Sequence, residues 1–456
     1  MTFRVAPVVV AMLVFAAACS SGDSVGPSET PSAPATVAPE QTTQPAPTAS
    51  STMPSSGVTS PGVTPTTAAP TTAAPTTTEH TPTRMEVPSG AVPDGDVRTI
   101  VEVLSSDEMA GRDNGTPGSE LARDYIVDQL DDFALPAYVW NGSYVQSFGS
   151  GSNIVAWLPG GELFDEIVMI GAHYDHVGSN CRNVRPTDDI CNGAADNAAG
   201  TAAVIEVARR IAAAGLPPRR SVVIALWDAE EDGLVGSRHY VTDPVLPLDQ
   251  VVAYVNLDIQ GSNVVPSAAN VTTLIGAETG GPHLIDAANA AAQASTLDTL
   301  MLSLIFGQGR SDHAPFVDAG VPAVFLSDGT NGCYHTVDDE VGRIDFDKLD
   351  QQLLSATALV GRLVNADDVP EFDPAPRTVT YDDAVEIERL VIAAEPDFAL
   401  LGPGGRATAE QFLVDLGAVV DTGPDAFDGA ATVVLLEGAG RFIEALAQAE
   451  CETAAE

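Results

Sequence analysis

Short, continuous apolar runs alternate with helical patterns between residues 95 and 365. The apolar runs cover residues 154–158, 167–172, 222–227, 251–257, 272–276 and 323–326. Uninterrupted runs of this length are typical of strands that are buried on both faces, and such strands are connected by helices. The sequence therefore predicts an α/β fold, a three-layer sandwich in which a mixed, mostly parallel sheet lies between helices.

The helical patterns cover residues 97–104, 119–130, 198–214, 284–294 and 346–363. Proline residues between positions 370 and 376 mark a boundary after this domain, which spans residues 95–365. Residues 366–456 are expected to form a small α/β extension, with helices at 381–394, 407–416 and 441–447 and strands at 398–401 and 432–436. The extension has no histidine, and the sequence does not indicate its role.

The N-terminal part of the chain has the composition of a signal and a spacer. Arg4 precedes an apolar run, and three alanines precede Cys19. Residues 1–19 thus have the form of a secretory signal peptide and resemble a bacterial lipoprotein site, in which Cys19 would be lipidated; ordinary secretion is the alternative. Residues 20–94 are dominated by Ser, Thr, Pro and Ala. They can bury too little surface to offset their backbone entropy, so we expect a disordered, extended spacer.

The chain is strongly acidic, with 20 Lys and Arg against 63 Asp and Glu and a formal net charge of −43. Such a surface repels phosphate and excludes electrostatic nucleic-acid binding as a main activity. After the first twenty residues no apolar run is long enough to cross a bilayer. We therefore expect membrane attachment only through a lipid anchor at Cys19.

The other four cysteines are candidates for disulfide bonds, because an exported chain meets oxidising conditions. Cys181 and Cys191 lie ten residues apart in one loop, and the sequence favours this pair. Cys333 and Cys451 would then be left over, and their pairing would hold the C-terminus beside the active region. The sequence leaves this second pair open.

Five polar segments end a predicted strand or open the loop after it. They are residues 173–176, 196–197, 228–231, 256–258 and 334–335. Open α/β sheets place their sites at the carboxyl ends of strands, so these segments can converge. Each offers side chains that bind hard-to-borderline cations. No single segment is specific for a metal site. The order of the five segments along the chain is what indicates one.

Six motifs in register resemble the co-catalytic zinc aminopeptidases, a family that includes secreted bacterial leucyl-type enzymes. The motifs are GAHYDH, NGAADNAAGTA, WDAEEDGLVGS, NLDIQG, GRSDHAPFVDAGVPAVFL and GCYHTVDD. The earlier segment EMAGRDNGTPGSELARDYI is similar to the opening of that family's catalytic domain. The resemblance covers residues 97–365 and implies a sandwich of the zinc exopeptidase type. Relatives with this fold include glutamate carboxypeptidase and glutaminyl cyclase.

The resemblance implies two zinc ions bridged by the carboxylate of Asp196. His173 and Asp258 would hold one ion, and Glu231 and His335 would hold the other. Each ion would then have three protein ligands and keep a position open for water, as catalytic zinc requires.

Four further residues receive roles from the same resemblance. Asp175 would accept a hydrogen bond from the second imidazole nitrogen of His173 and fix its tautomer. Glu230 would be the general base and later the proton donor to the departing amine. Tyr334 would donate to the tetrahedral oxyanion, and Arg310 would face the substrate.

The resemblance also implies a cis peptide bond between Asp196 and Asn197. His176 is expected beside the metal ligands rather than among them. Cys333 shows no pattern of pairing with histidine that a nucleophile would need. Asp312 and His313 are expected to lie near the site and to shape it. His80 falls in the spacer, and His239 and His283 fall on predicted helices.

These features together predict an exported zinc-dependent aminopeptidase that acts on peptides with a free N-terminus through a metal-activated hydroxide. A dipeptidase or carboxypeptidase and a glutaminyl cyclase are alternatives of the same fold. Cyclases typically have Ser after the bridging aspartate, whereas this chain has Asn197. A non-catalytic, receptor-like module is the least favoured reading, because every ligand position and Glu230 are chemically competent. The substrate's side-chain preference and the oligomeric state stay open.

Overall fold

The structure is a computed structural model of the chain and describes residues 95–132, 142–214, 217–375, 377–449 and 451. The predicted signal peptide, Cys19, the spacer and His80 lie outside the described residues. Within the described residues, none of the helices combines the length and the apolar character needed to cross a membrane.

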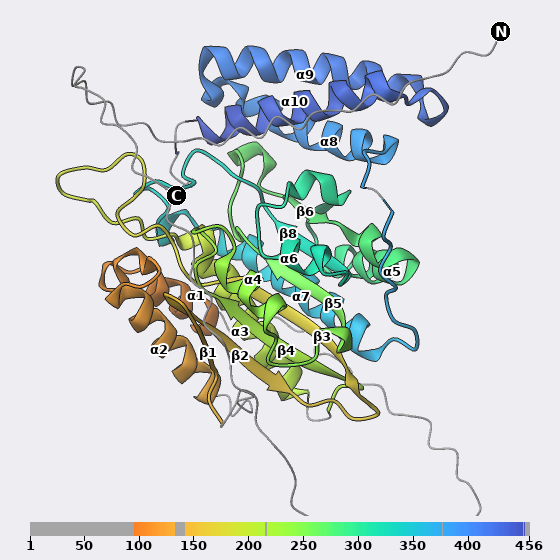
Figure 1. Cartoon of the computed structure of the whole chain (residues 1–456). Coiled ribbons are helices and arrows are strands. Elements are labelled where there is room, and N and C mark those ends of the chain that lie inside the picture. The colour runs from red at the N-terminus through yellow and green to blue at the C-terminus, as the bar shows by residue number, and fades with distance from the viewer. Residues whose placement is uncertain (1–94, 133–141, 215–216, 376, 450, 452–456) are drawn as a thin grey trace, which may run out of the picture. The chain divides into compact units, whose positions relative to one another are not determined.

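An eight-stranded sheet forms the centre of the described part (Figure 1), with the order β1-β2-β4-β3-β5-β8-β6-β7. Its strands are β1 (Val145–Phe148), β2 (Gly151–Leu158), β3 (Leu163–His173), β4 (Arg220–Trp227), β5 (Val251–Leu257), β6 (Val271–Ile275), β7 (Asp298–Leu302) and β8 (Ala323–Ser327). Strands β4, β3, β5 and β8 run parallel to their neighbours in this order. The carboxyl ends of these four strands therefore meet at one edge.

Helices cover both faces of the sheet. One face packs against α1 (Gly95–Leu104), α2 (Pro117–Asp132), α3 (Ala199–Ala213), α5 (Gly281–Ala292) and α7 (Phe346–Asn365). The other face packs against α4 (Val235–Thr242) and α6 (His313–Asp318). The predicted α/β sandwich with a mixed, mostly parallel sheet is confirmed.

The central strands form where the apolar runs are, because both of their faces are buried. In β3, Val168 and Ile170 face one hydrophobic cluster, while Ile167 and Met169 face the other. The elements that the sequence analysis missed are short, namely β1, β7 and α6, whereas α4 was expected only as the helix that carries His239. Strand β7 has the sequence DTLML, which is not a continuous apolar run. Only Leu300 and Leu302 of this strand are buried.

The described residues of the C-terminal extension form helices and no strands, so the predicted α/β character was wrong. Its helices are α8 (Tyr381–Ala394), α9 (Gly402–Thr422) and α10 (Gly429–Ala447). Residues 398–401 lie in a 3₁₀ helix and residues 432–436 lie in α10 rather than in strands.

Capping explains why the apolar run of α10 is helical. The Asp428 carboxylate accepts hydrogen bonds from the backbone N–H groups of Ala430 and Ala431 at 2.9 and 3.1 Å, so the helix begins before the run. Within the run Leu435 is fully buried, whereas Val433 is 51% exposed. The apolar residues therefore divide between a buried face and solvent, as a helix requires.

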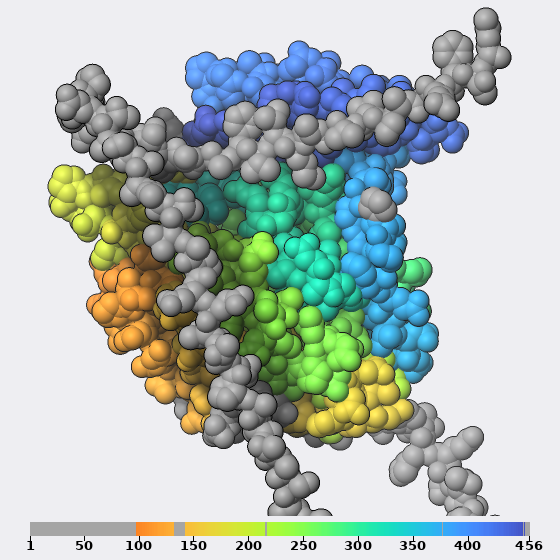
Figure 2. Space-filling model, in the orientation of Figure 1, coloured from red at the N-terminus to blue at the C-terminus, as the bar shows by residue number. Residues whose placement is uncertain are grey.

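The extension packs on the sheet instead of forming a separate appendage. Its buried residues share one hydrophobic cluster with Ile275 of β6, Leu302 of β7 and Phe325 of β8. The Asp383 carboxylate of α8 accepts hydrogen bonds from the backbone N–H and the hydroxyl of Ser303 at 2.7 and 2.8 Å. In Figure 2 the blue C-terminal helices lie directly against the green and teal residues of the preceding domain. Helices α8 to α10 thus cover the end of the sheet that α4 and α6 leave free.

The described chain contains two disulfide bonds, one local and one between distant segments. Cys181 pairs with Cys191 inside one loop. Cys333 pairs with Cys451, which follows α10. The second bond links the C-terminal extension to the loop that carries Tyr334 and His335.

Candidate metal centre

The first half of the candidate centre lies at the ends of β3 and β5. His173 is the last residue of β3, and Asp258 follows β5 directly. The imidazole Nε2 of His173 lies 3.3 Å from Asp258 Oδ1 and 3.3 Å from Asp196 Oδ1. All three side chains are buried, so the first predicted ligand set converges at the carboxyl edge of the sheet.

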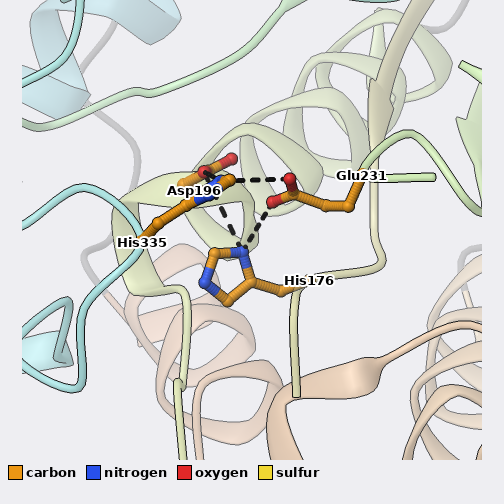
Figure 3. A group of neighbouring side chains, drawn as sticks. All are labelled: His176, Asp196, Glu231 and His335. Atoms are coloured by element: carbon orange, nitrogen blue, oxygen red, sulfur yellow. Dashed lines mark hydrogen bonds and ion pairs between the residues drawn. The ribbon is translucent and has the colours of Figure 1, made fainter. Parts of the chain in front are cut away.

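The second half lies on the other side of Asp196 and is drawn in Figure 3. Glu231 follows β4, and His335 comes from the loop after β8. His335 Nε2 lies 3.2 Å from Asp196 Oδ2 and 3.0 Å from Glu231 Oε2. The two carboxylate oxygens of Asp196 therefore face different groups of side chains, which is the arrangement of a bridging carboxylate.

His176 lies closer to this second group than the sequence analysis expected. Its Nδ1 is 2.9 Å from Glu231 Oε1 and 3.9 Å from Asp196 Oδ2, and its ring meets the His335 ring edge-on at 5.4 Å. Figure 3 shows the imidazole directed at both carboxylates. His176 therefore belongs to the set of side chains that could hold the second ion.

The spacing and chemistry of these groups fit metal ions. Neighbouring ligands of a tetrahedral zinc ion, each about 2.0–2.2 Å from the metal, lie about 3.3 Å apart, close to the distances found at Asp196. Asp196 Oδ2 and His335 Nε2 are buried and have no hydrogen-bond partner among the described residues. Histidine nitrogens and carboxylate oxygens are both zinc ligands, so the residues present fit two cations.

The charge of the centre also favours cations. Burial lowers the pKa of His335, but the carboxylates of Asp196 and Glu231 outweigh burial and raise this pKa to about 10. A shift in this direction means that the surroundings strongly stabilise a positive charge at the imidazole. The same carboxylates would stabilise a metal ion there.

The segment that carries Asp196 is held by residues on both sides of it. The peptide bond between Asp196 and Asn197 is cis, as the resemblance implied. Asn197 donates a hydrogen bond to the Leu257 carbonyl at 2.9 Å and accepts one from the Gly200 N–H at 3.1 Å. Thr201 donates to the His173 carbonyl at 2.8 Å. The start of α3 is thereby fixed to the ends of β3 and β5.

Asp339 is a supporting residue that the sequence analysis missed. Its carboxylate accepts hydrogen bonds from the backbone N–H groups of Ala195 at 2.9 Å and Asp196 at 3.1 Å. Asp339 is buried and lies four residues after His335. It therefore connects the loop of one predicted ligand to the backbone of another. Its position in the motif GCYHTVDD was the available signal.

Arg112 is the second residue that was missed, although it lies in the N-terminal signature. It is fully buried and donates hydrogen bonds to four carbonyl oxygens. The acceptors are Tyr174 at 2.8 Å, Asn192 at 2.7 Å, Gly193 at 3.0 Å and Leu104. The hydrogen bonds of Arg112 thus fix two loop segments, the one that follows His173 and the one that precedes Asp196. The signal was a charged residue inside a conspicuous motif.

Asp175 lies against His173 and also against the two glutamates. The Nδ1 of His173 is 3.2 Å from the Asp175 carbonyl oxygen and 3.5 Å from its carboxylate. The carboxylate accepts hydrogen bonds from the backbone N–H groups of Glu230 at 3.1 Å and Glu231 at 3.2 Å. Burial raises the pKa of Asp175 to about 6. Asp175 therefore positions both the imidazole and the glutamate pair.

A pocket adjoins the candidate centre and contains the remaining predicted residues. Glu230, Tyr334 and Arg310 line it together with Asp196 and Asp258. Glu230 is 9% exposed, and burial raises the pKa of its carboxyl group well above the usual range. The Tyr334 ring stacks on the His335 ring at 3.9 Å. The structure thus brings these side chains to one cavity, and their roles in catalysis stay predictions.

The other polar residues singled out in the sequence lie apart from this cavity or beneath it. Asp312 and His313, at the start of α6, are buried, and the His313 ring stacks on Phe325 at 4.7 Å. His239 lies on α4 and is partly exposed, while His283 lies on α5 and is exposed. Cys333 is in a disulfide bond and is not a free thiol.

Comparison with known proteins agrees with this geometry. A family model described as peptidase family M28 matches residues 153–359. Leupeptin-inactivating enzyme 1 of Streptomyces exfoliatus is 28% identical over 280 residues, which cover 55% of this chain and 57% of that enzyme. Aminopeptidase YwaD of Bacillus subtilis strain 168 is 30% identical over 216 residues, which cover 45% of this chain and 43% of that protein. The chain thus spans about half the length of these two curated relatives.

A solved structure shows the same fold. The LapA aminopeptidase of Legionella pneumophila superposes with a TM-score of 0.50 at 18% sequence identity, covering 61% of this chain and 73% of that chain. At this identity the likeness concerns the fold alone. The family resemblance predicted from the motifs is confirmed by the matching family model and the related sequences.

Proposed function

Because residues 153–359 match the model of peptidase family M28, we propose that the chain is an exported, zinc-dependent aminopeptidase. It would remove the N-terminal residue from peptides with a free amino terminus. The observation that carries the proposal is the convergence of histidine and carboxylate side chains on both oxygens of Asp196, beside a pocket that also holds Glu230.

Two zinc ions would be held by His173, Asp196 and Asp258 on one side and by Asp196, Glu231 and His335 on the other. His176 is within reach of the second group. When bound, the ions would polarise the scissile carbonyl and lower the pKa of the attacking water.

The protein's own residues would move the proton. Glu230 lies in the pocket next to these ligands, and its backbone N–H is held by Asp175. Its carboxylate would take a proton from the attacking water and deliver it to the departing amine. A general base works best with a pKa near the operating pH, and burial moves the pKa of Glu230 upward in that direction. The Tyr334 hydroxyl would donate to the oxyanion.

Removal of the metal is the first test. We expect the purified chain to release p-nitroaniline from L-leucine p-nitroanilide, to lose this activity after treatment with a zinc chelator, and to regain it when zinc is added back. N-acetyl-L-leucine p-nitroanilide is the control, because it lacks the free amine that an aminopeptidase requires. Activity that survives complete loss of zinc would overturn the proposal.

Arg310 gives the alternative of a carboxypeptidase or dipeptidase a specific basis, because this cationic residue is among those that line the pocket and would be available to pair with a substrate carboxylate. Peptides blocked at one end separate these activities. An aminopeptidase cleaves a peptide amide and spares an N-acetyl peptide, and a carboxypeptidase does the reverse. Conversion of an N-terminal glutamine to pyroglutamate, with loss of ammonia and no peptide bond cleaved, would instead indicate a cyclase.

We also propose that the protein is exported and anchored through a lipid on Cys19. The support is the cation, apolar run and small residues before this cysteine. Cys19→Ser is expected to move the protein from the membrane fraction to the soluble fraction and to abolish labelling by a radioactive fatty acid. Ser21→Ala is the matched control and should leave both unchanged. Equal membrane association of the Cys19→Ser chain would contradict the anchor.

A further inference from the structure

The fold holds the two halves of the candidate centre in different ways. His173 is the last residue of β3 and Asp258 directly follows β5, so the sheet itself fixes these two side chains. His335 instead comes from a loop that begins after β8 ends at Ser327. The His335 side chain is 28% exposed, whereas that of His173 is 1% exposed. The second half therefore depends on what holds this loop in place.

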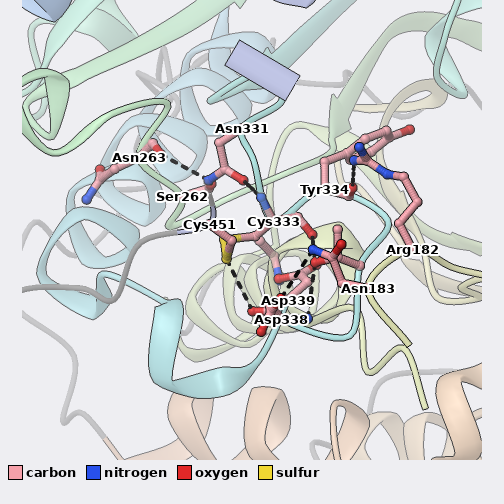
Figure 4. The surroundings of a disulfide bond; sticks show 12 residues. Arg182, Asn183, Ser262, Asn263, Asn331, Cys333, Tyr334, Asp338, Asp339 and Cys451 are labelled. Carbon is pink, nitrogen blue, oxygen red and sulfur yellow. Dashed lines mark hydrogen bonds between the residues drawn. A yellow bond between two sulfur atoms is a disulfide. The ribbon is translucent and has the colours of Figure 1, made fainter. Parts of the chain in front are cut away.

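The disulfide bond between Cys333 and Cys451 holds residues 331–337, which we call the His335 loop. It joins this loop to the chain after α10 (Figure 4). The two cysteines lie 118 residues apart in the sequence, and a cross-link over so long a stretch restricts the chain more than a local one does. The C-terminal helices share a hydrophobic cluster with the sheet. The disulfide therefore ties the His335 loop to a packed part of the fold.

Hydrogen bonds also tie the His335 loop to its neighbours, and they lie in exposed or partly buried surroundings. Asn331, at the start of the loop, donates to the Asn263 carbonyl at 3.0 Å. Arg182 donates from its backbone to the His335 carbonyl at 2.9 Å and from its guanidinium to the Tyr334 carbonyl at 2.6 Å. Arg182 is itself exposed to solvent. A loop held by such bonds alone would open more readily than the strands of the sheet.

The disulfide borders a cavity that a small thiol could enter. Cys333 and Cys451 both line this cavity, which has a volume of about 560 Å³, and Cys451 is partly exposed. A disulfide is reduced when a thiolate attacks one of its two sulfur atoms, so access to a single sulfur is sufficient. The bond that holds the His335 loop could therefore be opened without unfolding of the chain.

We propose that the disulfide between Cys333 and Cys451 is a redox switch that completes the second metal position. This inference rests on the proposed two-zinc aminopeptidase. When a dithiol reduces the bond, each cysteine gains one electron and one proton, and the dithiol closes to a cyclic disulfide. The His335 loop is then no longer joined to the helical extension, and His335 loses its fixed place opposite Glu231. The first position stays on the sheet, so the reduced protein would keep one zinc ion instead of two.

The switch would follow the location of the protein. Thiols are kept reduced in the cytosol, whereas disulfides form and persist outside it. If the chain is exported as proposed, the second metal position would be incomplete before export and would be completed when Cys333 and Cys451 are oxidised. Such a device would keep a peptidase inactive towards the peptides of the cell that makes it.

Cys451→Ser tests the switch without a reductant. Zinc measured by mass spectrometry should fall from two ions per chain to about one, because the His335 loop is released. For L-leucine p-nitroanilide, kcat/KM should fall by about 10²-fold or more, since both ions of a two-metal site stabilise the transition state. The double variant Cys181→Ser/Cys191→Ser is the matched control. It removes a disulfide that spans only ten residues and should keep both ions and nearly all activity.

Reduction of the folded, unmodified protein keeps the test decisive if Cys451→Ser does not fold. Treatment with dithiothreitol, blocking of the thiols with iodoacetamide and removal of both reagents should leave about one zinc ion per chain. The double variant Cys181→Ser/Cys191→Ser should lose one ion in the same way. Cys451→Ser should lose none beyond its untreated level, and this sample also controls for removal of zinc by dithiothreitol itself.

Hydrogen exchange separates release of the loop from a general loss of stability. The backbone N–H groups of Thr336 and Val337 donate to the carbonyls of Cys333 and Arg182. On reduction they should exchange at least about 10-fold faster, because these bonds lie in the released loop. The amides of β3 and β5, which lie inside the sheet, should exchange at an unchanged rate. Faster exchange in both places would indicate a structural role only and would contradict the switch.

The outcomes for the switch and for the proposed function are distinct. Two tightly held zinc ions and full activity in the reduced, unmodified protein would overturn the switch and leave the aminopeptidase function intact. Failure of the oxidised, unmodified protein to bind zinc or to cleave any free N-terminus would instead overturn the aminopeptidase function itself.

Discussion

Glu230→Gln is expected to lower kcat by about 10²-fold or more and to leave the zinc content unchanged. The amide has nearly the same shape as the carboxylate but cannot take a proton from water. The backbone N–H that Asp175 holds is not altered, so the chain around the centre should keep its conformation. Turnover of an aminoacyl p-nitroanilide and zinc per chain, measured by mass spectrometry on the same samples, give the two readouts.

Glu231→Gln is the matched control, because it makes the same change one residue further along the chain. Its carboxylate lies 3.0 Å from His335 Nε2 and faces the second ligand group. This variant should lose zinc, and its activity should fall in proportion. If Glu230→Gln loses the metal instead and keeps its activity per bound ion, the two glutamates have exchanged roles.

Asp196→Asn is expected to have the largest effect of any single ligand change. Asp196 Oδ1 lies 3.3 Å from His173 Nε2, and Oδ2 lies 3.2 Å from His335 Nε2, so both predicted ions depend on this one carboxylate. The amide retains only one oxygen and no charge. Zinc should fall from two ions per chain to one or fewer. Because metal ions contribute several kcal/mol to stabilising the transition state, kcat/KM should fall by about 10³-fold or more.

Asp232→Asn is the control for the loss of one negative charge near the centre. Asp232 directly follows Glu231 but is exposed to solvent. This variant should keep both zinc ions and nearly all activity. Two tightly held zinc ions in Asp196→Asn would contradict a bridging carboxylate, whatever the activity of that variant.

The central sheet and the convergence of the polar segments could be predicted from local patterns, whereas the assignment of the individual ligands came from the resemblance to the zinc aminopeptidases. Strands buried on both faces, such as β4, appear as unbroken apolar runs. The predicted ligands follow parallel strands whose carboxyl ends must meet at one edge, so their order along the chain contains the geometry. His173, Glu231 and Asp258 could therefore be placed together without coordinates.

The C-terminal extension could not be predicted in the same way. Residues 432–436 are apolar and β-branched in part, and this local preference favours a strand. The cap at Asp428 and the burial of Leu435 in the hydrophobic cluster that the extension shares with the sheet decide for a helix instead. Phe442 lies in the helix predicted at residues 441–447, and the sequence assigned it no role. Its place in the wall of the pocket beside the candidate centre depends on contacts with strands that lie more than one hundred residues earlier in the chain.

The supporting residues were missed for a related reason. Arg112 and Asp339 bind backbone groups rather than a metal ion or a side chain. Every segment of backbone offers N–H and carbonyl groups, so the sequence does not show which of them Arg112 or Asp339 would bind. Ligands can be found from the residue types that they require, whereas residues that hold the backbone become visible only once the chain is folded.

Arg112 has a further consequence for where this protein can be divided. Residues 153–359 contain every predicted metal ligand, yet a chain cut to these limits would lack the guanidinium that pairs with the carbonyls of Tyr174, Asn192 and Gly193. Each buried acceptor left without a partner costs about 1–3 kcal/mol, and a domain's whole stability is about 5–15 kcal/mol. The segment that the family model matches therefore lacks a residue on which the backbone around the centre depends, and we expect a shortened protein for crystallisation or engineering to fold only if it begins no later than α1.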